Sequence, residues 1–157
     1  MSSTFFFMAI TLATGALVPF QLAFNAQLGA TAKSPLTAGL IIFVVGAVAF
    51  AAILAVSRPS LPTVRDLAQA PATAWFGGLL AALYILAVVT VIPRIGGGMT
   101  AVLIIAGQLL VALVLEHYGG FNAPQNDLTP AKLAGAALVV TGVGVVNNAG
   151  PASKPRA

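Results

Sequence analysis

Three amide side chains inside long uncharged stretches are the residues of this sequence best suited to bind a ligand. Gln21 and Asn25 are four positions apart, so on a helix they lie about 40° apart on one face. Gln108 lies near the centre of a separate apolar run. Because an amide in hydrocarbon needs a hydrogen-bond partner, such side chains usually face the interior of a helix bundle. They could line a pathway for a solute, or they could tie neighbouring helices together.

Three further residues could support such a pathway. Tyr84, in the middle of another apolar run, offers a hydroxyl and a ring face. Pro19 lacks a backbone N–H, so we expect a helix break there that frees the carbonyl of Gly15. Glu116, at the end of a run, is the carboxylate placed for proton coupling. The alternative for Glu116 is a solvated charge at a helix end.

The composition indicates whether this chain is surrounded by water or by lipid. Of its 157 residues, 59% are hydrophobic and 6% are charged, against about 45–50% and about 25% in soluble domains. Its charged side chains, seven basic and three acidic, are too few to cover a globule in water. The sequence therefore predicts a protein that is embedded in a lipid bilayer.

Several function classes are excluded by the same counts. The isoelectric point near 10.2 reflects a net charge of +4, but the basic residues are scattered, whereas phosphate binding needs a clustered basic face. The chain has no cysteine and one histidine, His117, at the end of an apolar run. We therefore expect no nucleic-acid partner, no cofactor, no metal site, no catalytic residues and no enzymatic activity.

Charges and turn residues divide the sequence into five long apolar runs. A spanning helix needs about 20 apolar residues, with about 17 as the lower limit, and the runs lack the alternation of barrel strands. We predict an all-α membrane protein, a single transmembrane domain over 1–157 with a flexible tail over 151–157. Its helices are expected at about 4–29, 36–56, 72–92, 97–115 and 133–148.

The basic residues give the chain no clear orientation. With five spans, one face of the membrane receives three of them, Arg58, Arg65 and Lys132. The other face receives four, Lys33, Arg94, Lys154 and Arg156. Since the excess of Lys and Arg in short loops sets orientation, we predict a dual-topology chain that pairs as an antiparallel homodimer. Ten helices would then form an inverted-repeat transporter body. The alternative is one orientation that a few well-placed charges select.

Local sequence signatures resemble those of one family of small membrane proteins. The segments are PFQLAFNAQLGA (19–30), SPLTAGLIIFVVGA (34–47), PATAWFGGLLAALYI (71–85), IPRIGGGMTAVLIIAGQLL (92–110), EHYGGF (116–121) and LAGAALVVTGVGVV (133–146). Together they resemble the YdcZ-like family of the drug/metabolite transporter (DMT) superfamily, over about residues 5–147. The resemblance implies five spans, an antiparallel pairing of halves and an exporter of small molecules. Relatives often carry more tryptophan after the proline of the third segment, where this chain has only Trp75.

The sequence thus predicts a transmembrane transporter of the inner (plasma) membrane. The four-helix multidrug exporters of the superfamily depend on a carboxylate in the first helix, and no predicted span here contains one. A small neutral, zwitterionic or amphiphilic organic solute therefore fits better than a cation, exported by alternating access. The expected partners are membrane lipid, a second copy of the chain and the solute. The alternatives are a dual-topology ion channel and a structural subunit of a heteromeric membrane complex.

Overall fold

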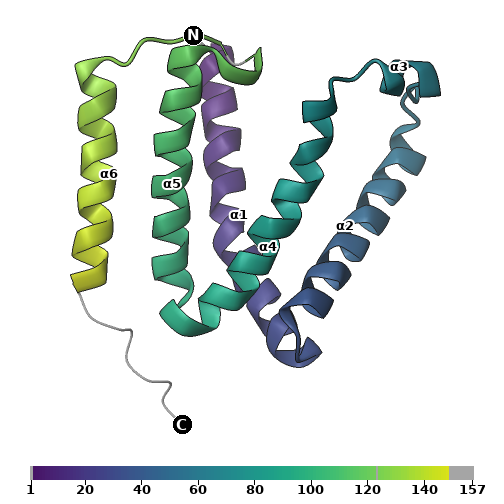
Figure 1. Cartoon of the computed structure of the whole chain (residues 1–157), viewed down its shortest axis with the longest axis horizontal. Helices are drawn as coiled ribbons and strands as arrows, with labels where there is room; N and C mark the ends of the chain where they lie inside the picture. Colours follow the sequence, from purple (N-terminus) through teal and green to yellow (C-terminus); the bar gives the residue numbers. More distant parts are fainter. Residues whose placement is uncertain (1, 123, 149–157) are drawn as a thin grey trace. The chain divides into compact units, whose positions relative to one another are not determined.

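The structure, a computed structural model, describes residues 2–122 and 124–148 (Figure 1). Its five long helices are α1 (Ser2–Ala32), α2 (Pro35–Ser57), α4 (Phe76–Ile95), α5 (Gly97–Tyr118) and α6 (Pro130–Asn148). Its short elements are α3 (Val64–Ala68), η1 (Ala72–Trp75) and η2 (Gly120–Asn122). These described ranges contain no strand, so the predicted all-α class is confirmed.

The five predicted spans are all present as helices long and apolar enough to cross a membrane. They cover Thr4–Ala32, Pro35–Ser57, Ala72–Ile95, Gly97–Tyr118 and Pro130–Asn148. Every span is longer than predicted, because the expected ends stood at prolines and charges. Arg94, Glu116 and Lys132 instead lie within the terminal turns, where a side chain at the membrane–water interface remains solvated. The expected flexible tail over 151–157 lies outside the described residues.

The chain divides into two compact units, Met1–Pro93 and Arg94–Ala157. The expectation of a single transmembrane domain stays a prediction.

The first unit starts with the antiparallel pair α1 and α2, and α4 then runs in the same direction as α1 (Figure 1). A sharp turn joins the pair: Lys33 has a left-handed backbone with φ 56°, and Ser34 caps α2. The Ser34 hydroxyl accepts a hydrogen bond from the Thr37 amide at 3.4 Å, and Pro35 occupies the first helical turn. This local chemistry sets where α2 begins.

At its other end, α2 is followed by a short helix that the sequence did not predict. Arg58 ends α2 in the left-handed region with φ 44°. Thr63 and Asp66 then form a capping box around the start of α3. The Thr63 hydroxyl (2.7 Å) and backbone N–H (2.8 Å) both donate to the Asp66 carboxylate. These bonds lower the pKa of Asp66, the hydroxyl more than the N–H, so its carboxylate stays charged next to the helix start.

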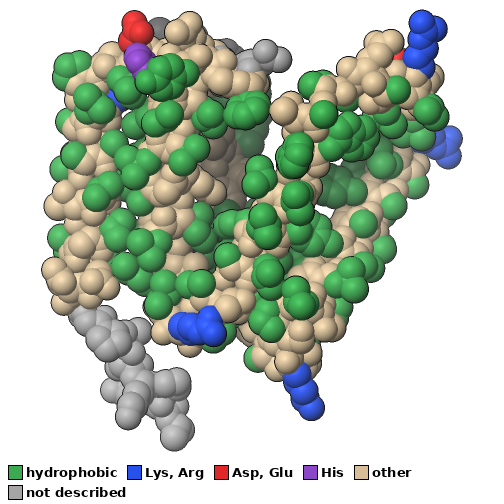
Figure 2. All heavy atoms as spheres, in the orientation of Figure 1, with side chains coloured by type: hydrophobic (Ala, Val, Ile, Leu, Met, Phe, Trp, Pro, Cys, Tyr) green, Lys and Arg blue, Asp and Glu red, His purple; other side chains and the backbone are tan. Residues whose placement is uncertain are grey.

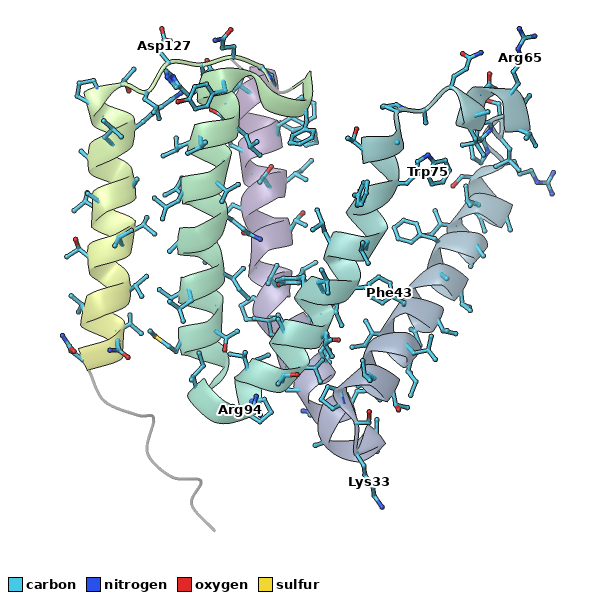
Figure 3. The ribbon with its side chains drawn as sticks, viewed as in Figure 1. Lys33, Phe43, Arg65, Trp75, Arg94 and Asp127 are labelled. Atoms are coloured by element: carbon cyan, nitrogen blue, oxygen red, sulfur yellow. The ribbon has the colours of Figure 1, made fainter. Side chains whose placement is uncertain are left out.

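The charged side chains lie at the ends of the helices, and the flanks between them are apolar (Figure 2). Within the first unit, Lys33 projects from one end and Arg65 from the other (Figure 3). Trp75 lies toward the Arg65 end and is 62% exposed, which suits an aromatic anchor at the membrane surface. A band of exposed apolar side chains between charged helix ends is the arrangement that a spanning bundle requires.

The second unit contains the α5–α6 hairpin, and Gly96 stands immediately before α5. Its backbone has φ 81° and ψ 158°, a region that only glycine enters readily. The Gly96 carbonyl accepts two hydrogen bonds from Thr100, from the amide at 3.1 Å and from the hydroxyl at 2.7 Å. Since Thr100 is buried, this cap is part of the packed start of α5.

We expect Gly96→Ala to destabilise the protein by about 1–3 kcal/mol, because a Cβ is strained in this backbone region. Gly97→Ala is the matched control, since Gly97 lies inside α5 with open space around it and alanine favours a helix. Thermal unfolding of the two purified variants measures the difference. Equal melting temperatures would show that the Gly96 conformation is not required.

Candidate functional site

One face of α1 turns inward along the second half of the helix. Its side chains are buried or half-buried at spacings of four and three residues, as on the packed face of a helix. We call this set the inward stripe of α1: Val18, Leu22, Asn25, Gly29 and Ala32. The candidate amide Asn25 therefore lies among residues that pack, and not on the outer surface of the helix.

Asn25 is the polar member of the inward stripe. Its side chain is only 7% exposed, and its Nδ2 is enclosed without a hydrogen-bond partner among the described residues. A buried donor without an acceptor is costly, by about 1–3 kcal/mol. Its burial in the packed face of α1 makes Asn25 a candidate for ligand contact.

One turn after Asn25, α1 passes very close to α4 at Gly29. A Cβ added at Gly29 would lie 2.5 Å from Cγ1 of Val89, closer than atoms can pack. A residue without a side chain is thus required here, as at the close crossings of membrane helices. The crossing fixes the position of α4 relative to the inward stripe.

A small apolar core surrounds this crossing and includes Val89. Its buried members are Ala38 of α2 with Ile85 and Val89 of α4. Partly buried side chains of all three helices pack against them: Leu28, Ala32, Ile42 and Tyr84. The predicted pathway residue Tyr84 thus lies in the same unit as Asn25, half-buried on α4.

The other two predicted amides lie in different surroundings. Gln21 is exposed although it is one turn before Asn25, and Gln108 is exposed near the middle of α5. The inward stripe passes through Leu22, which is only 2% exposed. Gln21 is offset from Asn25 by about 40° around the helix axis, and this offset is enough to place Gln21 outside the stripe. The structure therefore does not bring Gln21 and Asn25 into one buried site.

The helix break expected at Pro19 is absent. The α1 helix continues without interruption from Ser2 to Ala32, with Pro19 inside it and exposed. Transmembrane helices tolerate proline when the freed backbone carbonyl finds another partner or adjusts locally. Any pathway in this unit therefore passes beside a continuous helix.

In the second unit, Glu116 pairs with Lys132 and so links the end of α5 to the start of α6. The carboxylate and the ammonium group are 3.7 Å apart, with side chains 40% and 32% exposed. A pair this exposed contributes about 0–1 kcal/mol to stability. It lies in the last turn of α5, as expected for a charge near the membrane surface.

The loop after α5 folds back on the end of that helix, a feature that sequence reasoning missed. Gly119 adopts the left-handed conformation with φ 63°. The Gln125 side-chain amide donates to the His117 carbonyl at 3.2 Å, and the Asn126 backbone N–H donates to the Glu116 carbonyl at 2.9 Å. The available signal was the Gly119-Gly120 pair, which predicts a turn but not the return of the chain to α5.

Comparison with known proteins agrees with this architecture. A family model described as "Putative inner membrane exporter, YdcZ" matches residues 6–145. Curated proteins and solved structures gave no match. The family is one of transporters and not of enzymes, and its members reside in the inner membrane. With five helices able to span that membrane and a match over most of its length, the chain belongs to the YdcZ family of inner-membrane exporters.

Proposed function

We propose that the chain exports a small neutral, zwitterionic or amphiphilic organic solute by alternating access. In this proposal two copies insert in opposite orientations and pair as an antiparallel homodimer. The family match supports export across the inner membrane. The pairing brings ten helices together in the inverted-repeat arrangement that alternating-access transporters use.

The observation that carries this proposal is the exposed amide near the middle of α5. Gln108 lies far from both ends of α5 and is exposed among the described residues of its unit. An amide that faces lipid loses its hydrogen bonds, so polar side chains at this depth usually face protein or a water-filled path. A second copy of the chain would supply that protein surface.

The balance of basic residues supports opposite insertion of the two copies. Over the whole sequence, one membrane face receives three basic residues and the other receives four. Neither membrane face gains the excess of positive charge that selects a cytoplasmic side. Both orientations are therefore expected from one sequence.

The proposed pathway uses the amides and the phenol that the sequence singled out. Asn25 contributes a buried donor, Gln21 and Gln108 contribute exposed amides, and Tyr84 contributes a half-buried ring. Glu116 is the proposed coupling carboxylate, because its protonation would remove the charge that pairs with Lys132.

Reporter fusions test the pairing of orientations. One C-terminal reporter should be active only in the cytoplasm and a second only outside it. We expect both fusions to give signal, because the basic residues select no side. A silent reporter in a fusion that is well expressed would contradict the proposal.

A further inference from the structure

The unpaired atom of Asn25 is a hydrogen-bond donor, and this decides which solute chemistry it can meet. Nδ2 carries N–H groups that only an acceptor can satisfy. The atom is enclosed, and the side chain is more than nine-tenths buried. An oxygen atom is the partner that would complete this site.

The packing around Asn25 restricts the direction from which such an oxygen can arrive. On the C-terminal side the inward stripe is closed, since Val89 already occupies the space beside Gly29. On the N-terminal side Leu22, the preceding residue of the stripe, is only 2% exposed, and the exposed amide of Gln21 lies outside the stripe. Since both neighbours along the stripe are packed, a solute oxygen would reach Asn25 across the stripe and not along it.

The charges of the chain determine which kind of oxygen compound fits. The acidic residues are Asp66, Glu116 and Asp127. None of them lies in α1, α2 or α4, so a cation would find no carboxylate beside Asn25. A carbonyl or carboxylate oxygen, by contrast, accepts directly from the Asn25 amide.

We propose that Nδ2 of Asn25 recognises a carbonyl or carboxylate oxygen of the exported solute, and that organic cations are excluded there. This inference rests on the export function proposed above and names the chemical class of its solute. The solute is small and apolar apart from this oxygen, because the neighbours of Asn25 on the inward stripe are aliphatic or glycine.

Three probes that share one ring separate the alternatives: phenylacetamide, phenylacetate and phenethylammonium. Calorimetric titration of the purified protein should detect binding of the first two and not of the third. Asn25→Asp exchanges the donor for an acidic acceptor of the same size. This variant should bind phenylacetate about tenfold more weakly or worse, and it should gain binding of phenethylammonium.

Gln27→Glu is the matched control, because Gln27 is an exposed amide on the same helix and outside the proposed pathway. It adds the same charge and should keep the native preference. If Asn25→Asp does not yield folded protein, Asn25→Leu removes the donor without adding charge. That variant should lose both oxygen probes and gain nothing.

Three results would overturn the inference: native protein that prefers phenethylammonium, native protein that binds none of the probes, or Asn25→Asp with native affinity for phenylacetate. Flux into proteoliposomes separates this failure from failure of the transport proposal. Saturable flux of phenethylammonium alone would support the transport proposal and refute the role of Asn25. The predicted binding pattern without flux would keep the role of Asn25 and refute transport.

Discussion

Gly29→Ala is expected to destabilise the protein by about 1–3 kcal/mol, the usual cost of overpacking a filled position. The new Cβ would lie 2.5 Å from Cγ1 of Val89, and a β-branched side chain has few other rotamers in a helix. Either Val89 must rotate, or α1 and α4 must separate. Both changes disturb the inward stripe one turn after Asn25, so solute binding should weaken together with stability.

A compensating substitution makes this prediction specific. Val89→Ala removes the clashing methyl group, and the Val89 Cβ is 3.9 Å from the position of the added atom, an ordinary contact. The double variant should therefore be more stable than the sum of the two single changes predicts, in a double-mutant cycle of thermal unfolding. Gly15→Ala is the control on the same helix, because nothing lies within 4 Å of a Cβ added there. A Gly29→Ala protein as stable as this control would contradict the close crossing.

The second large effect concerns orientation, and it should remove transport altogether. Two lysines inserted after Ser2 should hold the N-terminus in the cytoplasm, because basic residues near a span are retained there. A protein in which every copy has the same orientation cannot form the antiparallel pair. We expect its flux to fall to the background of empty vesicles.

A second variant that is biased toward the opposite membrane orientation should restore the transport that the first variant loses. Ala30→Lys with Thr31→Lys adds two charges at the exposed end of α1, next to Lys33. Cations are favourable at a helix C-terminus, so this change should not disturb α1. Each variant alone should be inactive, and the two expressed together should regain flux of the solute that the native protein carries. Native activity from either variant alone would rule out the antiparallel dimer.

The number and the class of the spans could be predicted because both follow from the composition of long segments. A run of about 20 apolar residues has few alternatives to a helix across a bilayer. The helix ends were less predictable. Hydropathy decreases at Arg94 and at Glu116, but hydrogen bonding continues to Ile95 and Tyr118, because helices extend into the interface.

The candidate site was harder to predict than the spans. Helical spacing placed Gln21 and Asn25 on one face, but packing separates them, since the inward stripe is centred on Leu22 and Asn25. The spacing of two residues gives the angle between them around the helix axis. Whether either one is buried depends on which other helix packs against that face and at what position. On α1 the close approach of α4 at Gly29 is such a contact. It involves Val89, which is sixty residues later in the sequence.

The folded-back loop after α5 has a consequence for biosynthesis. The last helix, α6, is the least apolar of the five spans and begins beside the charge of Lys132. The loop is bonded to the end of α5, and Glu116 pairs with Lys132 from there. A nascent α6 would thus enter the bilayer next to α5, which is already inserted. Glu116 at the end of α5 would be available to pair with Lys132. The two helices would leave the translocation machinery as one hairpin, and α6 would depend on α5 for its insertion.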